Sequence, residues 1–238
     1  MHERHLDPTD DVVTDEGLPL TVAVGPGDTT CGVVILHEIW GLTDAVIGLV
    51  TRFAADGYVV AAPHLYHRTG SALVEDSTYR LARRVHNTLN VGSIRSDLVS
   101  AIEWCRASGA DKVGVVGFSM GGTIALWAAA ELDIDAAVTF YGGGITSERW
   151  PGLLSGTEAA RNLKAPWLGI YGGRDRSTPP RDLEAMRAVL PPDISAKVMV
   201  YPDAGHGFAL DPESSSYRAG PAQEAFEVMD GFLGEHLR

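Results

Sequence analysis

Short runs of apolar residues alternate along the chain with longer segments that are apolar on one side only. Seven runs of five or six residues are rich in valine, isoleucine and alanine, as is typical of strands buried on both faces. They predict strands at 20–24, 32–36, 58–62, 112–116, 136–141, 167–171 and 197–201. Because helical segments separate most of these strands, the pattern predicts an α/β fold with a mostly parallel sheet and helices on both of its faces.

The segments between the strands predict helices because their apolar residues recur at helical spacing. In one of them these residues are Ile94, Leu98, Ile102 and Cys105. The other predicted helices cover 43–56, the residues that follow Ser119, 181–190 and 222–237. No repeat and no long linker divides the chain, so we predict a single domain over 18–238, preceded by an N-terminal extension at 1–17.

Composition and charge exclude several classes of protein. The 238 residues carry a formal net charge of −12 and no cluster of lysine and arginine, so we expect no nucleic-acid partner. The N-terminus is charged and no apolar run approaches the ~20 residues that span a bilayer, which predicts a cytoplasmic protein with no membrane partner. The two cysteines, Cys31 and Cys105, are expected to be reduced and buried.

The sequence GFSMG at 117–121 stands between an apolar strand and the next helix. Glycines two residues before and after Ser119 leave room for a sharp turn that lifts the serine side chain clear of the sheet. This GxSxG pattern, between a strand and a helix, is the nucleophile elbow of α/β-hydrolases. The alternative is a tight glycine turn with an incidental serine, but the strand and helix around it favour a nucleophile.

A serine hydroxyl becomes a nucleophile when a base takes its proton and an acid orients that base. Asp175 stands in the loop after the strand 167–171, and His206 follows the strand 197–201. The order Ser, Asp, His is that of the α/β-hydrolases, and all three residues follow the C-terminal ends of predicted strands. We therefore predict a catalytic triad in which Ser119 is the nucleophile, His206 is the base and Asp175 is the orienting acid.

Acyl transfer also requires N–H donors for the oxyanion. Met120, which follows the serine, is expected to provide one backbone N–H at the start of a helix. The second is expected from Ile39 in the loop ILHEIWGL at 35–42, where Glu38 is its neighbour.

The histidines outside the predicted triad form no metal-binding pattern. His2 and His5 are close in sequence, as are His64 and His67, but no cysteine or carboxylate completes a ligand set. We therefore expect no metal.

Six short motifs carry a family resemblance. They are ILHEIWGL at 35–42, APHLYHR at 62–68, GFSMGG at 117–122, FYGGG at 140–144, YGGRD at 171–175 and AGHGF at 204–208. In this order they resemble the dienelactone hydrolase family, also called carboxymethylenebutenolidases, from residue 18 to the C-terminus. The resemblance implies an α/β-hydrolase fold without a large lid domain, no cofactor, and hydrolysis of a small-molecule ester or lactone. It also implies that Glu38 is the family's strand-end glutamate, close to the nucleophile.

The nucleophile is one departure from the family pattern. Well-studied dienelactone hydrolases use a cysteine in GxCxGG, where the glutamate helps to form the thiolate, and this chain has Ser119. Because a serine hydroxyl has a much higher pKa, we expect His206 to deprotonate it alone. Glu38 is then expected to hold its loop or to hydrogen-bond near the nucleophile, and the alternative is a carboxylate that satisfies backbone donors.

The substrate contacts are a second departure. In the family's lactone enzymes two arginines bind the substrate carboxylate; Arg68 matches one of them, whereas Leu210 occupies the second position. A single arginine recognises a strongly anionic lactone weakly, so the sequence favours neutral or more apolar esters. Besides Arg68 and Leu210, the predicted pocket residues are the aromatic residues Trp40, Tyr141, Trp150 and Phe208, for which core packing is the alternative role.

Together these features predict a serine hydrolase of the dienelactone hydrolase type, a monomer or homodimer that acts through an acyl-enzyme. A carboxylesterase or acyl peptidase on other compounds is a close alternative. From a different class, a binding protein would keep the fold without turnover. Three catalytic residue types at strand ends argue against that last alternative.

Overall fold

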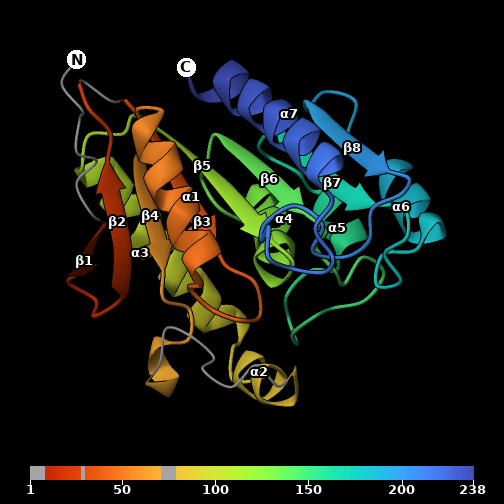
Figure 1. Ribbon diagram of the computed structural model, residues 1–238, viewed down its shortest axis with the longest axis horizontal. Helices are drawn as coiled ribbons and strands as arrows, with labels where there is room; N and C mark the ends of the chain where they lie inside the picture. The colour runs from red at the N-terminus through yellow and green to blue at the C-terminus, as the bar shows by residue number, and fades with distance from the viewer. Residues whose placement is uncertain (1–8, 28–29, 71–78) are drawn as a thin grey trace.

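The computed structural model describes residues 9–27, 30–70 and 79–238 of the chain. Within them, eight strands form one sheet in the order β1-β2-β4-β3-β5-β6-β7-β8 (Figure 1). Only β2 runs opposite to the other described strands. The strands are β1 Asp10–Val13, β2 Pro19–Val24, β3 Cys31–Leu36, β4 Val59–Pro63, β5 Lys112–Phe118, β6 Ala136–Phe140, β7 Trp167–Gly172 and β8 Ala196–Tyr201.

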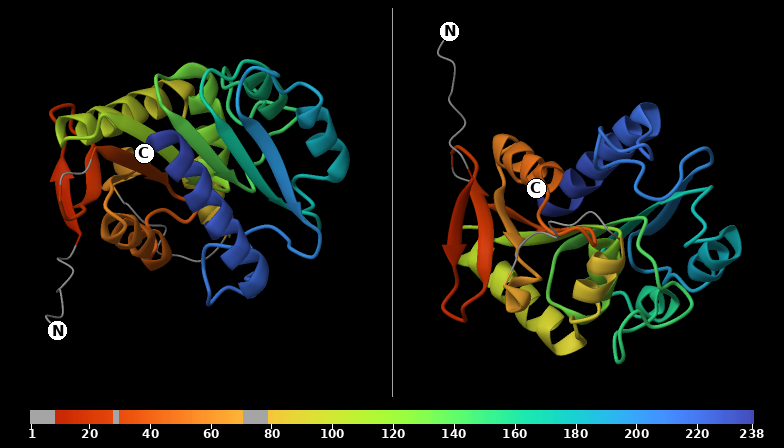
Figure 2. Two further views of the ribbon diagram at one scale, coloured as in Figure 1. Left: turned by 90° about the horizontal axis from the view of Figure 1, so that it is seen from above. Right: turned by 60° about the horizontal axis from the view of Figure 1, so that its bottom comes forward.

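Helices cover both faces of the sheet (Figure 2). They are α1 Asp44–Ala55, α2 Tyr79–His86, α3 Val91–Ala107, α4 Met120–Glu131, α5 Gly156–Arg161, α6 Pro180–Arg187 and α7 Ala219–Leu237, with a 3₁₀ turn at His67–Thr69. The helices α1 and α7 pack on one face, and α3 and α4 pack on the other. Two hydrophobic cores result, one on each side of the sheet, which explains why β3 to β7 are almost fully buried.

The predicted α/β fold class is confirmed. All seven predicted strands occur within two residues of their predicted ends, and the five predicted helices are present as well. Cys31 and Cys105 are buried and free, as expected. Among the described residues, no helix combines the length and the apolar character that crossing a membrane requires.

Besides the 3₁₀ turn, three elements were not predicted, each for a physical reason. The edge strand β1 lies inside the stretch 1–17 that the sequence suggested was an extension; its side chains are mostly exposed, and it pairs with β2. The helix α2 carries three arginines and buries only Ala82 and His86. The helix α5 has six residues and depends on a capping box at Ser155 for its start.

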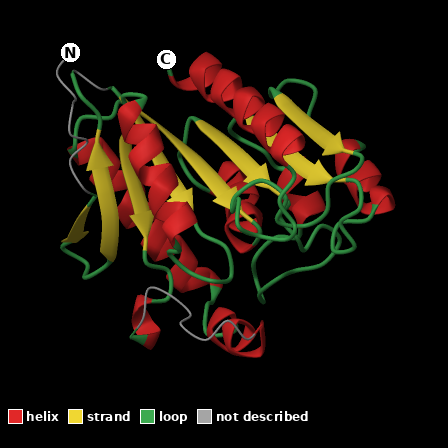
Figure 3. Ribbon diagram, in the orientation of Figure 1, coloured by secondary structure: helices red, strands yellow, loops and turns green. Residues whose placement is uncertain are grey.

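The carboxyl ends of β3, β5, β7 and β8 lie at the same edge of the sheet because these strands are parallel. The loops that follow them gather there, beyond the arrowheads (Figure 3). No large lid domain stands over these loops in the part of the chain that is described. This edge is where open α/β sheets bind their ligands.

Candidate active site

Ser119 stands at the turn between β5 and α4. Its backbone φ is 51°, in the left-handed region that residues other than glycine rarely adopt. A hydrogen bond of 2.9 Å from the Ser119 N–H to the Phe140 carbonyl oxygen holds the turn. Strained backbone of this kind persists where the surrounding structure fixes it, and here it presents the serine hydroxyl at the edge of the sheet.

Glycines let this turn approach the neighbouring strands closely. A Cβ on Gly117 would lie 2.0 Å from the carbonyl oxygen of Gly121, and a Cβ on Gly121 would lie 2.3 Å from the carbonyl oxygen of Leu36. Non-bonded atoms cannot approach to such distances, so only glycine fits at either position. The glycines of GFSMG therefore set the backbone geometry on which the serine depends.

The structure brings the three predicted triad residues together. Oγ of Ser119 lies 2.8 Å from Nε2 of His206, and Nδ1 of His206 lies 2.7 Å from Oδ2 of Asp175. Oδ1 of Asp175 accepts hydrogen bonds from the N–H and the hydroxyl of Ser177, at 2.8 and 2.7 Å. Because an ionised carboxylate only accepts, Nδ1 of His206 carries the proton and Nε2 is left to accept one from the serine.

Burial and hydrogen bonding shift the pKa values of His206 and Asp175 in opposite directions. Burial lowers the pKa of His206, but the hydrogen bond and charge of Asp175, together with the charge of Glu38, raise it above its ordinary value. Burial raises the pKa of Asp175, but the hydrogen bonds from His206 and Ser177 outweigh burial and leave that pKa lowered. Asp175 is therefore ionised and stabilises a proton on the imidazole.

Ile39 and Met120 both line the cavity beside Ser119. In the described part of the chain, neither backbone N–H donates a hydrogen bond to another residue. Met120 is the first residue of α4, where no preceding turn satisfies the amide. Both N–H groups therefore remain candidates for the oxyanion donors that acyl transfer requires.

A buried histidine that the sequence analysis did not single out fixes the loop of Ile39. Nδ1 of His37 lies 2.6 Å from the Glu38 carbonyl oxygen, which also accepts a hydrogen bond of 3.1 Å from the Gly41 N–H. Burial lowers the pKa of His37 to about 4, so the ring is neutral, and Nδ1 carries the proton because a carbonyl only accepts. The Glu38 carbonyl and the Ile39 N–H belong to one planar peptide and point in opposite directions, so these bonds also orient the Ile39 N–H.

Two further contacts join this loop to the start of α4. The Gly121 N–H donates a hydrogen bond of 3.1 Å to the His37 carbonyl oxygen. The buried Tyr66 hydroxyl donates to the Ile39 carbonyl oxygen at 3.0 Å and lies 3.3 Å from the sulfur of Met120. The two candidate donors are therefore held by one network of buried contacts.

Glu38 lies on the cavity wall close to the triad. Burial raises the pKa of its carboxyl, although the charge of His206 and the nearby Tyr141 hydroxyl lower it. That hydroxyl is itself buried and has no hydrogen-bond partner of normal geometry among the described residues. An ionised Glu38 raises the pKa of His206, in the same direction as Asp175 does.

A cavity of about 870 Å³ opens beside the serine hydroxyl. Its wall includes the predicted residues Glu38, Ile39, Trp40, Ser119, Met120, Asp175, His206 and Leu210. Four other predicted residues are not on this wall, namely Arg68, Tyr141, Trp150 and Phe208. Among the residues that the structure describes, no group of three or more histidine, cysteine or acidic side chains is arranged to hold a metal ion.

The residues missing from the wall have other partners. Arg68 forms a bidentate pair with Asp97, with N···O distances of 2.7 and 2.8 Å, so its guanidinium is already engaged. Tyr141 and Phe208 are fully buried, and the Tyr141 ring packs 5.1 Å from the His206 imidazole and 5.7 Å from Phe208. Arg68, Tyr141 and Phe208 therefore do not line the cavity, although the sequence predicted that they contact the substrate.

Four arginines that the sequence analysis did not single out do line the cavity. They are Arg149, Arg174, Arg176 and Arg218. They stand in the loops after β6 and β7 and just before α7, and only Arg174, in YGGRD, belongs to one of the six motifs. The expectation of a neutral substrate considered only positions 68 and 210, so it left these four charges out.

A parallel sheet that presents a serine at the turn between a central strand and the following helix defines the α/β-hydrolase class. The family follows from comparison with known proteins, because the model of the dienelactone hydrolase family matches residues 20–237. The chain belongs to this family of hydrolases, which confirms the resemblance carried by the six motifs.

Individual relatives agree with this assignment. A protein of Yersinia pestis named "Putative carboxymethylenebutenolidase" is 33% identical over 213 residues, which cover 86% of this chain and 78% of that protein. A protein of Saccharolobus solfataricus with the same name is 28% identical over 245 residues, with 87% and 90% covered. The crystal structure of a "Putative Dienelactone Hydrolase" from Klebsiella pneumoniae has a TM-score of 0.87 at 27% identity and covers 95% of this chain and 98% of that one.

Proposed function

We propose that this protein is a serine hydrolase that cleaves a carboxylic ester or lactone through a covalent acyl-enzyme. The observation that carries the proposal is the hydrogen-bonded chain from Ser119 through His206 to Asp175, with distances of 2.8 and 2.7 Å, at the wall of a cavity. These distances meet the geometric requirement for general base catalysis. The names of the Yersinia pestis and Klebsiella pneumoniae relatives favour an ester or lactone bond as the target.

In the first half of the reaction, Oγ of Ser119 forms a bond to the carbonyl carbon while Nε2 of His206 takes the hydroxyl proton. The carbonyl π electrons move to its oxygen, which accepts hydrogen bonds from the N–H groups of Ile39 and Met120. When this oxyanion collapses, the bond to the alcohol oxygen breaks and His206 delivers its proton there. The alcohol of an ester leaves, whereas that of a lactone stays attached to the acyl group.

In the second half, His206 removes a proton from water as the water oxygen attacks the acyl carbon. Collapse of the second oxyanion breaks the bond to Oγ of Ser119, which regains its proton from His206. One water is consumed and a carboxylic acid is released. Asp175 stays ionised throughout and stabilises the imidazolium that forms twice in each cycle.

Labelling with a fluorophosphonate tests the nucleophile directly, because the reagent forms a stable bond with an activated serine. We expect the parent protein to be labelled at Ser119, as located by mass spectrometry of its peptides, and Ser119→Ala to remain unlabelled. Ser147→Ala is the matched control, since this exposed serine lies in the loop after β6. Its labelling should equal that of the parent.

The alternatives make different predictions in the same assay. A parent protein that is folded by circular dichroism but is not labelled contradicts serine catalysis and favours a binding protein. A labelled protein that hydrolyses acyl peptides and no ester or lactone keeps the triad but contradicts the proposed substrate bond.

A further inference from the structure

The carboxylate of Asp175 is itself held by a side chain to which no role has yet been given. The Asp175 side chain is 1% exposed, and its Oδ2 is bound to His206. The other oxygen, Oδ1, accepts two hydrogen bonds from Ser177, one from the backbone N–H and one from the hydroxyl. Among the described residues, no further group donates a hydrogen bond to this carboxylate. The orientation of the acid therefore depends on the residue two positions after it.

The hydroxyl of Ser177 contacts both the acid and the base. Its Oγ lies 2.7 Å from Oδ1 of Asp175 and 3.3 Å from Nδ1 of His206. Because Nδ1 carries the proton that it donates to Asp175, the hydroxyl proton is directed to the carboxylate and a lone pair of Oγ is left toward Nδ1. Ser177 is exposed and lines the cavity, which places its hydroxyl on the cavity side of the buried carboxylate.

A carboxylate needs such contacts because its last torsion angle is soft. Rotation about the Cβ–Cγ bond of an aspartate has broad minima, so the rotamer alone leaves the plane of the carboxylate loosely defined. The N–H of Ser177 restrains Oδ1 through an Asx turn, a contact that the backbone makes whatever the side chain at position 177 is. The hydroxyl is a second donor to the same oxygen. Two donors on Oδ1 fix the plane that one donor leaves free to turn.

Ser177 orients the carboxylate without neutralising it. Arg174 and Arg176 flank Asp175 in the sequence, yet in the described part of the chain neither forms an ion pair with it. An arginine bound to Asp175 would compensate the negative charge that stabilises a proton on the imidazole. A hydroxyl is neutral, so the net charge of the carboxylate remains available to the imidazole.

We propose that Ser177 is a positioning residue of the triad, whose hydroxyl holds the carboxylate of Asp175 in line with Nδ1 of His206. This inference rests on the proposed function. In each half of the reaction the imidazole gains a proton and then loses it, so the contact at Nδ1 must keep its geometry through both changes of charge. Ser177 itself exchanges no proton with the substrate and forms no bond to it.

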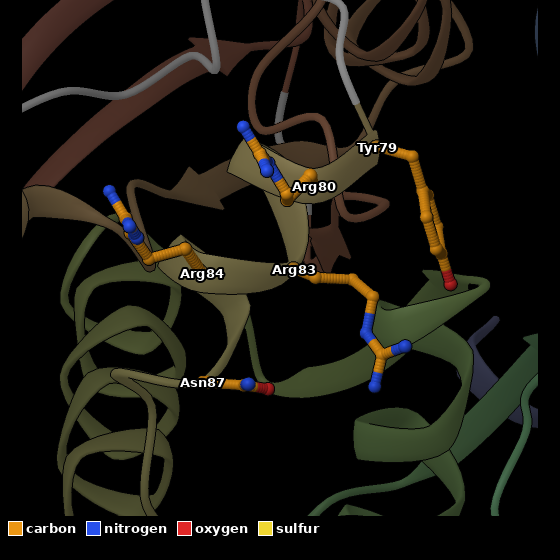
Figure 4. Close-up of a pocket in the computed structure, with 5 residues that line it drawn as sticks. All are labelled: Tyr79, Arg80, Arg83, Arg84 and Asn87. Atoms are coloured by element: carbon orange, nitrogen blue, oxygen red, sulfur yellow. The ribbon is translucent and has the colours of Figure 1, made fainter.

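The charges that act on His206 come from several elements. Besides Asp175, the charge of Glu38 raises the pKa of His206, and that of Arg149 in the loop after β6 lowers it. Further charged residues line the same cavity, namely Arg174, Arg176, Asp211 and Arg218. The three arginines of α2 line a separate depression in the surface (Figure 4). Because none of these charges changes when one neutral residue replaces Ser177, a shift in the pH profile reports on the contact between acid and base.

Replacing the hydroxyl tests the inference by kinetics. Ser177→Ala keeps the backbone N–H, and because the residue is exposed we expect the variant to melt as the parent does in circular dichroism. For a neutral 4-nitrophenyl ester, kcat should fall about tenfold with little change in KM, far less than the loss of about 10⁴ that replacement of the acid itself causes. The acidic limb of kcat/KM should move to lower pH, since a looser carboxylate stabilises the protonated imidazole less. Ser177→Thr keeps the hydroxyl and should recover most of the rate.

Proton NMR observes the contact directly. A proton in a short hydrogen bond to a carboxylate resonates far downfield of the backbone amides, and isotope labelling of the histidine nitrogens identifies the Nδ1 proton of His206. This resonance should move upfield in Ser177→Ala and stay close to its parent position in Ser177→Thr. Ser215→Ala is the matched control, because it removes another exposed hydroxyl from the same cavity wall, and no hydrogen bond among the described residues joins that hydroxyl to the triad. Its resonance and pH profile should equal those of the parent.

Three results overturn the inference. The first is an unchanged kcat with an unchanged resonance in Ser177→Ala. The second is an acidic limb that moves to higher pH, because the hydroxyl then acts by dispersing the charge of the carboxylate rather than by holding it in place. The third is a loss of rate that Ser177→Thr does not recover.

The inference and the proposed function fail in different ways. Ser119→Ala cannot form an acyl-enzyme but keeps Asp175 and His206, so the resonance can be followed without turnover. If the parent is neither labelled nor active, but adding Ser177→Ala to Ser119→Ala still moves the resonance, the proposed function fails and the positioning contact stands. If labelling succeeds and the resonance is the same with and without the Ser177 hydroxyl, the opposite holds.

Discussion

The two sides of the cavity are built in different ways. On the side of Ser119, the candidate catalytic groups are positioned mainly by the backbone: a left-handed turn, glycines in contact with neighbouring strands, and the peptide between Glu38 and Ile39. On the side of Arg149, the guanidinium is oriented by side chains, through His86 and Trp150. From this comparison we expect the first side to determine whether a bond is cleaved, and the second to determine which molecule carries it. Substitutions should therefore separate into those that slow every substrate and those that change the preference between substrates.

The largest expected effect on the first side is that of Asp175→Asn. The amide keeps the shape of the side chain but no longer stabilises a proton on His206, so we expect kcat to fall by about 10⁴ for a neutral and for an anionic 4-nitrophenyl ester alike. Steady-state kinetics measures this, with the ratio between anionic and neutral esters unchanged. A loss confined to one ester would contradict the separation of the two sides.

A smaller loss is expected when the loop of the Ile39 donor is released. His37→Leu removes the hydrogen bond to the Glu38 carbonyl, and since loss of a whole oxyanion donor costs about 10² to 10³, a misoriented one should lower kcat by about tenfold to a hundredfold. KM should change little, because the contact acts on the transition state. His37→Asn, whose side-chain amide reaches a position similar to that of Nδ1, should recover most of the rate. Failure of this rescue, with both variants folded, would indicate a role in packing only.

The smallest effect is a shift in pH dependence. His206 must be neutral to accept the serine proton, so kcat/KM falls as pH drops through its pKa, which the charges of Asp175 and Glu38 raise. Glu38→Gln removes one of these charges, so the pKa of His206 falls and the acidic limb of the profile moves to lower pH. At pH values above this limb, the rate should stay within about threefold of the parent. A shift to higher pH would contradict the electrostatic role of Glu38.

The sequence predicted the first side of the cavity better than the second. Ser119, Asp175 and His206 stand after strands with a strong apolar pattern, so their meeting at one edge follows from the parallel sheet. The positions of Ile39 and Met120 could be predicted for the same reason, because each comes soon after the end of a predicted strand. His37 was missed because its role depends on a hydrogen bond to the neighbouring peptide, which no periodicity reveals.

The second side was missed for a different reason. Arg149 lies in an irregular loop after β6, and His86 lies at the end of α2, a polar helix with almost no apolar face. Nothing in the sequence pairs two residues 63 positions apart when neither belongs to a motif. The same applies to Arg68, whose bond to Asp97 on α3 could not be predicted from the match of its motif.

The close approach of Gly121 to the Leu36 carbonyl has a consequence for how activity is lost on heating. The turn that carries the nucleophile and the strand that leads to the oxyanion loop are separated only by the thickness of two backbones, with no flexible side chain between them. Because α4 packs on β3 and β5, we expect any widening of this contact to disturb the packing of that helix as well. We therefore expect thermal inactivation to follow the cooperative melting of the central sheet.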